Sequence, residues 1–170
     1  MKSWLMAFRP KTLSAAIVPI FVATALVFSQ GIEVKWWISI FALLSSICIQ
    51  IATNLFNDAI DFKKGADTET RIGPQRVTQS GLFSPKLVLG IAVLFLVLAM
   101  ATGIPLVLEG GLPIVIVGVA SLFLAYSYTG GPFPLAYLGL GDLFVILFFG
   151  LIAVGGVFFI QSQQLSQPAI

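Results

Sequence analysis

The residues with the clearest chemical pattern lie at the end of an apolar stretch near the middle of the chain. They are two amides and two carboxylates at positions i, i+3, i+4 and i+7: Asn54, Asn57, Asp58 and Asp61. On a helix these positions share one face. Carboxylates this close raise each other's pKa unless a cation lies between them. Oxygen ligands suit Mg²⁺, which also binds substrate phosphates, so the spacing predicts a magnesium site for a phosphorylated substrate.

Two arginines follow this acidic cluster in the next hydrophilic stretch, Arg71 and Arg76. Guanidinium groups bind phosphate oxygens through paired hydrogen bonds. A metal held by carboxylates, with arginines beside it, is what a diphosphate needs at a membrane surface. The alternative is that the acidic residues are merely solvated at the interface and that the arginines only orient the protein. Ionisable residues at the edge of a membrane span nevertheless indicate function by default.

Three polar residues further along the chain are weaker candidates for substrate contact: Tyr126, Tyr128 and Asp142. The tyrosine rings could stabilise an allylic cation, or they could anchor the membrane interface, as aromatic residues commonly do. Asp142 could help to bind an aromatic substrate or could simply cap the next helix. Near the N-terminus, Arg9 and Lys11 could reach a diphosphate, with anchoring of the first span as the alternative.

The composition requires lipid as the solvent for most of the chain. Of the 170 residues, 58% are hydrophobic and 9% are charged, and the mean hydropathy is +1.04; an ordinary soluble domain has roughly a quarter of charged residues. The nine Lys and Arg residues form no run, so nucleic-acid binding has no support. Histidine is absent and Cys48 is the only cysteine, which leaves neither a disulfide nor a cysteine-based metal site.

Five stretches are apolar and long enough to cross a bilayer, for which about 20 residues are needed. We therefore expect an all-α fold, a multi-span transmembrane helical bundle. Its expected spans cover roughly residues 12–30, 37–57, 84–108, 112–129 and 140–161. Since no internal repeat, low-complexity tract or linker divides the chain, residues 1–170 are expected to form a single domain.

The basic residues predict how the bundle is oriented. Eight of the nine precede the first span or lie in or just beyond the loop between the second and third spans, whereas Lys35 alone lies on the other side. Positive residues favour the cytoplasmic side. We expect a multi-pass protein of the inner (cytoplasmic) membrane, with the N-terminus and the active-site loops in the cytoplasm and residue 170 outside. Trp36 and Trp37 suit the external interface.

The acidic stretch resembles the first aspartate-rich motif of the UbiA-type intramembrane prenyltransferases. It has the form Asn57-Asp58-x-x-Asp61, with Asp67 beyond it. Residues 57–76 as a whole resemble more narrowly the 1,4-dihydroxy-2-naphthoate polyprenyltransferase branch, which acts in menaquinone biosynthesis. Other stretches carry the same resemblance: Phe8-Arg9-Pro10-Lys11-Thr12, Tyr128-Thr-Gly-Gly-Pro132 and Gly139-Leu-Gly-Asp142.

This resemblance implies the transfer of a polyprenyl group from polyprenyl diphosphate to 1,4-dihydroxy-2-naphthoate, giving demethylmenaquinone. It implies that four residues hold Mg²⁺ against the diphosphate: Asn57, Asp58, Asp61 and Asp67. The first three of these are the expected catalytic residues. Six residues are the candidates for substrate binding: Lys11, Arg71, Arg76, Tyr126, Tyr128 and Asp142. The expected partners are these two substrates and the lipid bilayer.

The chain differs from the family in one respect. Members carry a second aspartate-rich motif on a later helix, and the 170 residues contain no such motif. The sequence thus resembles the N-terminal part of such an enzyme, about five helices of a larger bundle, and the 170 residues alone are expected to be inactive. Three alternatives stay open: another aromatic acceptor such as 4-hydroxybenzoate, a non-catalytic membrane fragment, or a transporter-like bundle. Against a transporter, the acidic residues lie near one membrane face and no inverted repeat of broken helices is visible.

Overall fold

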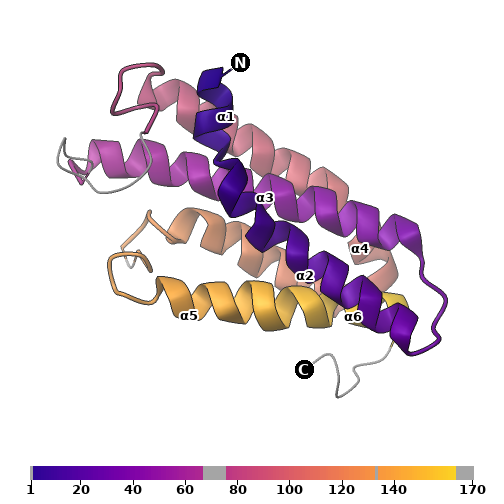
Figure 1. The fold of residues 1–170 in the computed structure, drawn as a ribbon. Helices are drawn as coiled ribbons and strands as arrows, with labels where there is room; N and C mark the ends of the chain where they lie inside the picture. The colour runs from indigo at the N-terminus through magenta and orange to yellow at the C-terminus, as the bar shows by residue number, and fades with distance from the viewer. Residues whose placement is uncertain (1, 67–75, 133, 164–170) are drawn as a thin grey trace.

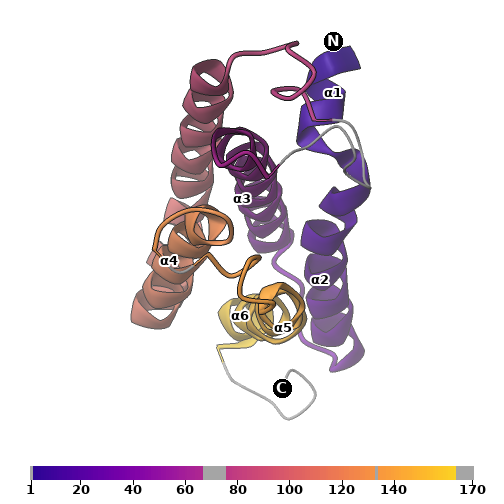
Figure 2. The ribbon, with the colours of Figure 1, turned by 90° about the vertical axis from the view of Figure 1, so that its left-hand side faces the viewer.

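The computed structural model of the chain describes residues 2–66, 76–132 and 134–163. These residues form helices joined by short connections, with no β-strand among them. The helices make an elongated bundle in which the chain runs back and forth between two ends (Figure 1). Viewed along the bundle, α3 lies between α2 and α4, and α5 and α6 lie below α3 between the same two helices (Figure 2). The expected all-α membrane bundle is confirmed.

The N-terminal region contains two helices where one span was predicted. α1 (Lys2–Phe8) and α2 (Pro10–Ser29) are joined at Arg9, whose φ of 51° lies in the left-handed region. Proline suits the first position of a helix, because no intrahelical N–H bond is required there. α2 therefore begins at Pro10 rather than at residue 12. The short helix α1 packs against α3.

The helix α3 (Trp36–Lys63) continues past the predicted end at residue 57, so the acidic residues lie on its last turns. Its apolar side holds it in place. Ile51, Leu55 and Ala59 of α3 are buried in one hydrophobic cluster with Val88 of α4. Because the polar residues of α3 alternate with these apolar ones at helical spacing, packing of one side presents the other side to the rest of the bundle.

The element α4 (Pro85–Ser127) is a hairpin of two helices that reverses direction at Gly111 (Figure 1). Gly111 has a φ of 64° and a ψ of −150°, a combination essentially confined to glycine. The two arms correspond to the third and fourth predicted spans. The predicted connection around residues 109–111 is therefore a reversal at one residue rather than a loop.

The last span consists of α5 (Gly141–Val145), a π-helical segment (Ile146–Ile152) and α6 (Ala153–Ser162). Its bounds agree with the predicted span at 140–161. The π-helical segment was not predicted, since its wider turn has no simple signature in the apolar pattern. Such segments are rare and occur frequently at functional sites.

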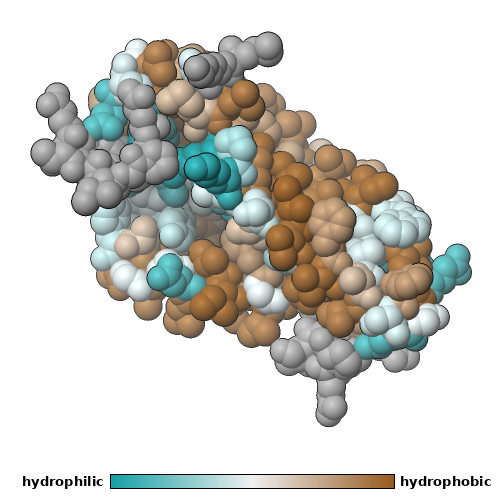
Figure 3. All heavy atoms as spheres, in the orientation of Figure 1, coloured by the Kyte–Doolittle hydropathy of each residue, from teal (hydrophilic) through white to brown (hydrophobic). Residues whose placement is uncertain are grey.

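The face of the bundle seen in Figure 3 is apolar along most of its length, and hydrophilic residues gather toward its two ends. Several large hydrophobic side chains are exposed on the surface of the bundle; Leu108 is 80% exposed and Phe28 is 75% exposed. The described residues include apolar helices long enough to cross a membrane. These features identify a multi-pass membrane protein.

Candidate functional site

A cavity of about 560 Å³ lies between α2, α3, both arms of α4 and the last span. One end of the cavity is polar, where its lining includes Arg9, Lys11, Thr12, Gln50, Thr53, Asn54, Asn57 and Tyr128. The other end is apolar, where its lining includes Ile20, Ala42, Leu106, Ile114, Val157 and Ile160. This gradient fits a ligand with a charged head and a hydrocarbon tail.

The polar end is formed largely by one stripe of α3, which carries Gln50, Thr53, Asn54 and Asn57. Asn54 is buried, and its amide group donates hydrogen bonds to the carbonyl of Phe8 at 3.0 Å and to the hydroxyl of Thr12 at 2.8 Å. These bonds fix the start of α2 against α3. They explain how Arg9 and Lys11 come to line the same end of the cavity.

Asp58 is turned away from this stripe. Successive residues of a helix are about 100° apart, so Asp58 points to a different side from Asn57. Its carboxylate accepts hydrogen bonds from the backbone N–H groups of Val77 and Thr78, both at 3.1 Å, and from the Thr78 hydroxyl. The carboxylate therefore anchors the turn at residues 76–80. The predicted single face of amides and carboxylates divides into two.

Asp61 lies near the C-terminal end of α3, between Arg76 and Tyr137. The Arg76 guanidinium contacts one carboxylate oxygen of Asp61 at 2.7 Å, and the Tyr137 hydroxyl donates to the other at 2.5 Å. Arg76 also donates to the carbonyl of Asn57 at 2.5 Å. Since Asp58 is 1% exposed and Asp61 is 9% exposed, the interpretation that these acids are merely solvated at the interface is wrong.

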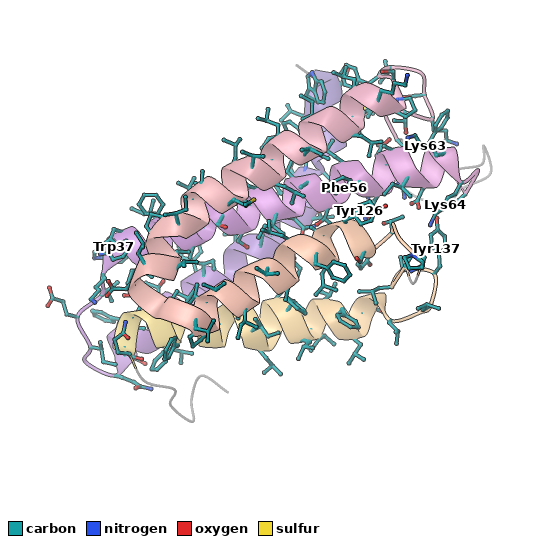
Figure 4. All side chains as sticks on the ribbon, turned by 180° about the vertical axis from the view of Figure 1, so that it is seen from behind. Trp37, Phe56, Lys63, Lys64, Tyr126 and Tyr137 are labelled. Atoms are coloured by element: carbon teal, nitrogen blue, oxygen red, sulfur yellow. The ribbon has the colours of Figure 1, made fainter. Side chains whose placement is uncertain are left out.

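The connection between α4 and α5 closes over this end of α3. The Thr129 hydroxyl donates to the side-chain oxygen of Asn57, and the Lys64 ammonium donates to the Thr129 carbonyl at 2.8 Å. Lys64 also lies 4.8 Å from the ring centre of Tyr137 (Figure 4). Lys64, Thr129 and Tyr137 were not among the candidate residues. The Tyr-Thr-Gly-Gly-Pro stretch that begins at residue 128 and the Gly-Leu-Gly-Asp stretch that begins at residue 139 pointed to this connection.

The two candidate tyrosines lie in different places. Tyr128 lines the cavity, and its hydroxyl approaches Gly141 so closely that a Cβ added there would lie 2.8 Å from it. Burial, and secondarily the charge of Asp142, raises the pKa of the Tyr128 phenol, which therefore stays protonated and can donate a hydrogen bond at neutral pH. Tyr126 packs edge-on against Phe56 instead, with ring centres 5.6 Å apart (Figure 4).

Three candidates remain: Asp142, which does not line the cavity, and Asp67 and Arg71. Asp142 is exposed in the first turn of α5, where Leu140 takes the cap position, so the capping interpretation of Asp142 is wrong. Its charge still suits the positive end of that helix. Asp67 and Arg71 lie outside the described residues.

The donor set at the polar end consists of oxygen atoms, the type that hard cations bind. Asn57 lines the cavity, and Asp61 lies one turn further along the same stripe of α3. Within the described parts of the chain, no three His, Cys, Asp or Glu residues converge on a common point. The side-chain oxygens of Asn57 and Asp61 accept from other side chains, those of Thr129, Arg76 and Tyr137, which a bound cation could displace. Both oxygens of Asp58 accept backbone N–H groups instead.

Comparison with known proteins gives consistent matches. The UbiA prenyltransferase family model matches residues 16–170. The chain is 36% identical to the 1,4-dihydroxy-2-naphthoate octaprenyltransferase of Haemophilus influenzae, in an alignment that covers 100% of this chain and 58% of that protein.

Proteins with the same name in Escherichia coli and Bacillus subtilis are 36% and 33% identical. These alignments cover 96% and 95% of this chain, and 55% and 52% of the respective relatives. The chain spans about half the length of the curated relatives that it matches.

Proposed function

Because the chain belongs to the UbiA prenyltransferase family, we propose that the protein transfers a polyprenyl group from polyprenyl diphosphate to 1,4-dihydroxy-2-naphthoate. The observation that carries this proposal is the cavity, which is polar at one end and apolar at the other. The names of the relatives support the same donor class and acceptor. The reaction would form a lipid-soluble naphthoquinol on the way to demethylmenaquinone.

In this proposal the diphosphate occupies the polar end of the cavity. Arg9 and Lys11 supply positive charge there, and cationic side chains bind phosphate oxygens strongly. The apolar end receives the hydrocarbon tail, which gains free energy by leaving water. The membrane-spanning architecture suits this task, because the donor already resides in lipid.

Members of this family generally depend on a metal, and we propose that Mg²⁺ serves this chain, held by Asn57 and Asp61. When bound, it would neutralise the negative charge of the departing diphosphate. Asp58 would act on the site through the turn at 76–80, since that turn carries Arg76. Asp67 and Arg71, which follow α3 in the sequence, remain proposed members of the same site.

The proposed reaction is an electrophilic aromatic prenylation. The allylic C–O bond breaks and its electron pair leaves with the diphosphate. A ring carbon of the electron-rich naphthoate then bonds to the allylic carbon, and the ring loses its carboxylate as carbon dioxide. The largely apolar wall of the cavity would limit the water that could otherwise capture the cation. The rings of Tyr128, Phe144 and Phe148, which line the cavity, can stabilise the cation through their faces.

The test measures prenyl transfer in membranes that contain the protein at its full natural length. We expect a Mg²⁺-dependent product from polyprenyl diphosphate and 1,4-dihydroxy-2-naphthoate, identified by its mass, and no product from 4-hydroxybenzoate. Activity with 4-hydroxybenzoate alone would assign a different acceptor. No transfer to either acceptor would reject the proposed activity and leave a non-catalytic role.

We also propose that the protein lies in the inner (cytoplasmic) membrane with the polar end of the cavity facing the cytoplasm. The basic residues support this orientation, because Arg9, Lys11, Lys63 and Lys64 belong to that end of the bundle. The water-soluble naphthoate would then enter from the cytoplasm, and the released diphosphate would leave to the cytoplasm.

A further inference from the structure

We infer that two glycines in the cavity wall, Gly118 of α4 and Gly156 of α6, set how long a prenyl tail the protein accommodates. Both residues line the cavity and are half-buried. This inference rests on the proposed function, since it concerns the tail of the proposed donor. It assigns the specificity for tail length to positions remote from the polar end.

Neither glycine is required by the backbone. Both lie in helices without the positive φ that would favour glycine, and glycine in a helix interior is less favourable than alanine by about 1 kcal/mol. Gly111 is different, because its φ is 64°. Local conformation therefore gives no reason for glycine at positions 118 and 156.

Close packing does not require them either. A Cβ added at Gly118 or at Gly156 would meet no heavy atom within 4 Å. By contrast, a Cβ at Gly110 would lie 2.3 Å from Ile114, and one at Gly130 would lie 2.7 Å from the ring of Tyr126. What the missing side chains at 118 and 156 provide is open space within the cavity wall.

The two positions lie at different depths below the polar end. Gly118 precedes Tyr128 by ten residues, which is roughly 15 Å along a helix axis. At the apolar end the two helices meet, because a Cβ added at Gly110 would lie 3.1 Å from Ile160. Counted from there, Gly156 is four residues from Ile160, roughly 6 Å, whereas Gly118 is eight residues from Gly110, roughly 12 Å. A large side chain at 118 should therefore obstruct a shorter tail than the same side chain at 156.

The test measures binding to the purified protein in lipid nanodiscs, with Mg²⁺ present. The ligands are non-hydrolysable prenyl thiodiphosphates of increasing tail length, from geranyl through geranylgeranyl to longer polyprenyl chains. The variants are Gly118→Phe and Gly156→Phe, with Gly118→Leu as a smaller change. Gly90→Phe is the matched control, because Gly90 lies in α4, is exposed, and also has no atom within 4 Å of an added Cβ.

We expect each phenylalanine to lower affinity for tails that reach its depth by about tenfold or more, while affinity for the geranyl compound stays the same. The loss of affinity should begin at a shorter tail in Gly118→Phe than in Gly156→Phe. Gly118→Leu should lose less affinity than Gly118→Phe, and Gly90→Phe should lose none. Melting temperatures of all variants should be no lower than that of the unaltered protein, which separates cavity filling from misfolding.

Two results would overturn the inference in different ways. If the unaltered protein prefers long tails and both phenylalanine variants keep that preference, or lose all tails equally, Gly118 and Gly156 do not set tail length, although the proposed function stands. If the unaltered protein binds none of the thiodiphosphates, the inference fails together with the proposed donor.

Discussion

Asp58 and Asp61 carry the same carboxyl group three residues apart on α3, yet their surroundings give them different tasks. The Asp58 carboxylate accepts two backbone N–H groups of the following turn. The Asp61 carboxylate is paired with Arg76 and the Tyr137 hydroxyl. The sequence predicted two equivalent metal ligands, because spacing along a helix does not reveal which backbone groups the next segment brings to each side chain.

The anchoring role of Asp58 leads to a prediction about the turn that it holds. In Asp58→Asn, the loss of charge and one acceptor oxygen should weaken the bonds to Val77 and Thr78, and a buried donor left unsatisfied costs about 1–3 kcal/mol. Hydrogen exchange of the 77–80 amides should therefore accelerate in lipid nanodiscs. The exposed Asp142 provides the control Asp142→Asn, which should leave that exchange unchanged.

The opposite outcome for Asp58 is equally informative. If exchange at the turn is unchanged in Asp58→Asn but Mg²⁺ binding is lost, the side chain must reach the cation in solution. Asp58 would then be a metal ligand, as the resemblance implied.

Tyr137 offers a second prediction, because its hydroxyl joins the α4–α5 connection to α3. Tyr137→Phe removes the bond to Asp61 but keeps the ring beneath Lys64. We expect faster hydrogen exchange of the amides of residues 135–138 and a loss of about 1 kcal/mol in stability. Tyr126→Phe is the control, since its ring packs against Phe56 in either form. Equal effects of the two substitutions would show that the hydroxyl of Tyr137 does not hold the connection.

At the scale of elements, apolar stretches predicted the five spans, because each must match the thickness of a bilayer. Three local features escaped prediction for physical reasons. The break at Arg9 depends on a left-handed backbone that the residue type does not indicate. The continuation of α3 to Lys63 places polar residues in a helix that the hydropathy pattern had ended. The π-helical turn at 146–152 is as apolar as the α-helix around it.

The reversal at Gly111 gives a prediction for the α4 hairpin. Its φ of 64° and ψ of −150° are unfavourable for any residue with a Cβ, so Gly111→Ala should cost about 1–3 kcal/mol. Gly90→Ala is the matched control, because neither added Cβ would contact another atom within 4 Å. It lies within a helix and should stabilise slightly. Thermal unfolding in detergent compares the two, and equal melting temperatures would show that the reversal tolerates a side chain.

At the scale of the whole molecule, the sequence indicated several of the polar residues that line the cavity but not the shape of the cavity. Asn57, Lys11 and Tyr128 were candidates and line one cavity, because polar residues in so apolar a chain have few other places to lie. Gln50 and Thr53 were not selected, although they recur on the same stripe of α3 as Asn57. The apolar end of the cavity could not be predicted, since its residues resemble those that face lipid.

The arrangement of the whole bundle also separates its charges. Lys63 and Lys64 lie at one end, and Trp37 lies at the opposite end (Figure 4). Lys35 at that opposite end is paired with Glu109 at 2.6 Å, which leaves little net positive charge there. The folded structure thus keeps the asymmetry on which the predicted orientation depends.

Labelling with an impermeant maleimide tests this orientation directly. Cys48 is first replaced by serine, and single cysteines are then introduced at Leu82 and at Glu33, which are exposed in connections at opposite ends of the bundle. In intact cells we expect labelling of Glu33→Cys but not of Leu82→Cys, which should react only after the membrane is opened. Because the polar end of the cavity lies on the same side as Leu82, labelling of Leu82→Cys from outside would place that end in the external medium. The diphosphate and the naphthoate would then have no cytoplasmic route to the site, and the proposed reaction would need donors supplied from the other face.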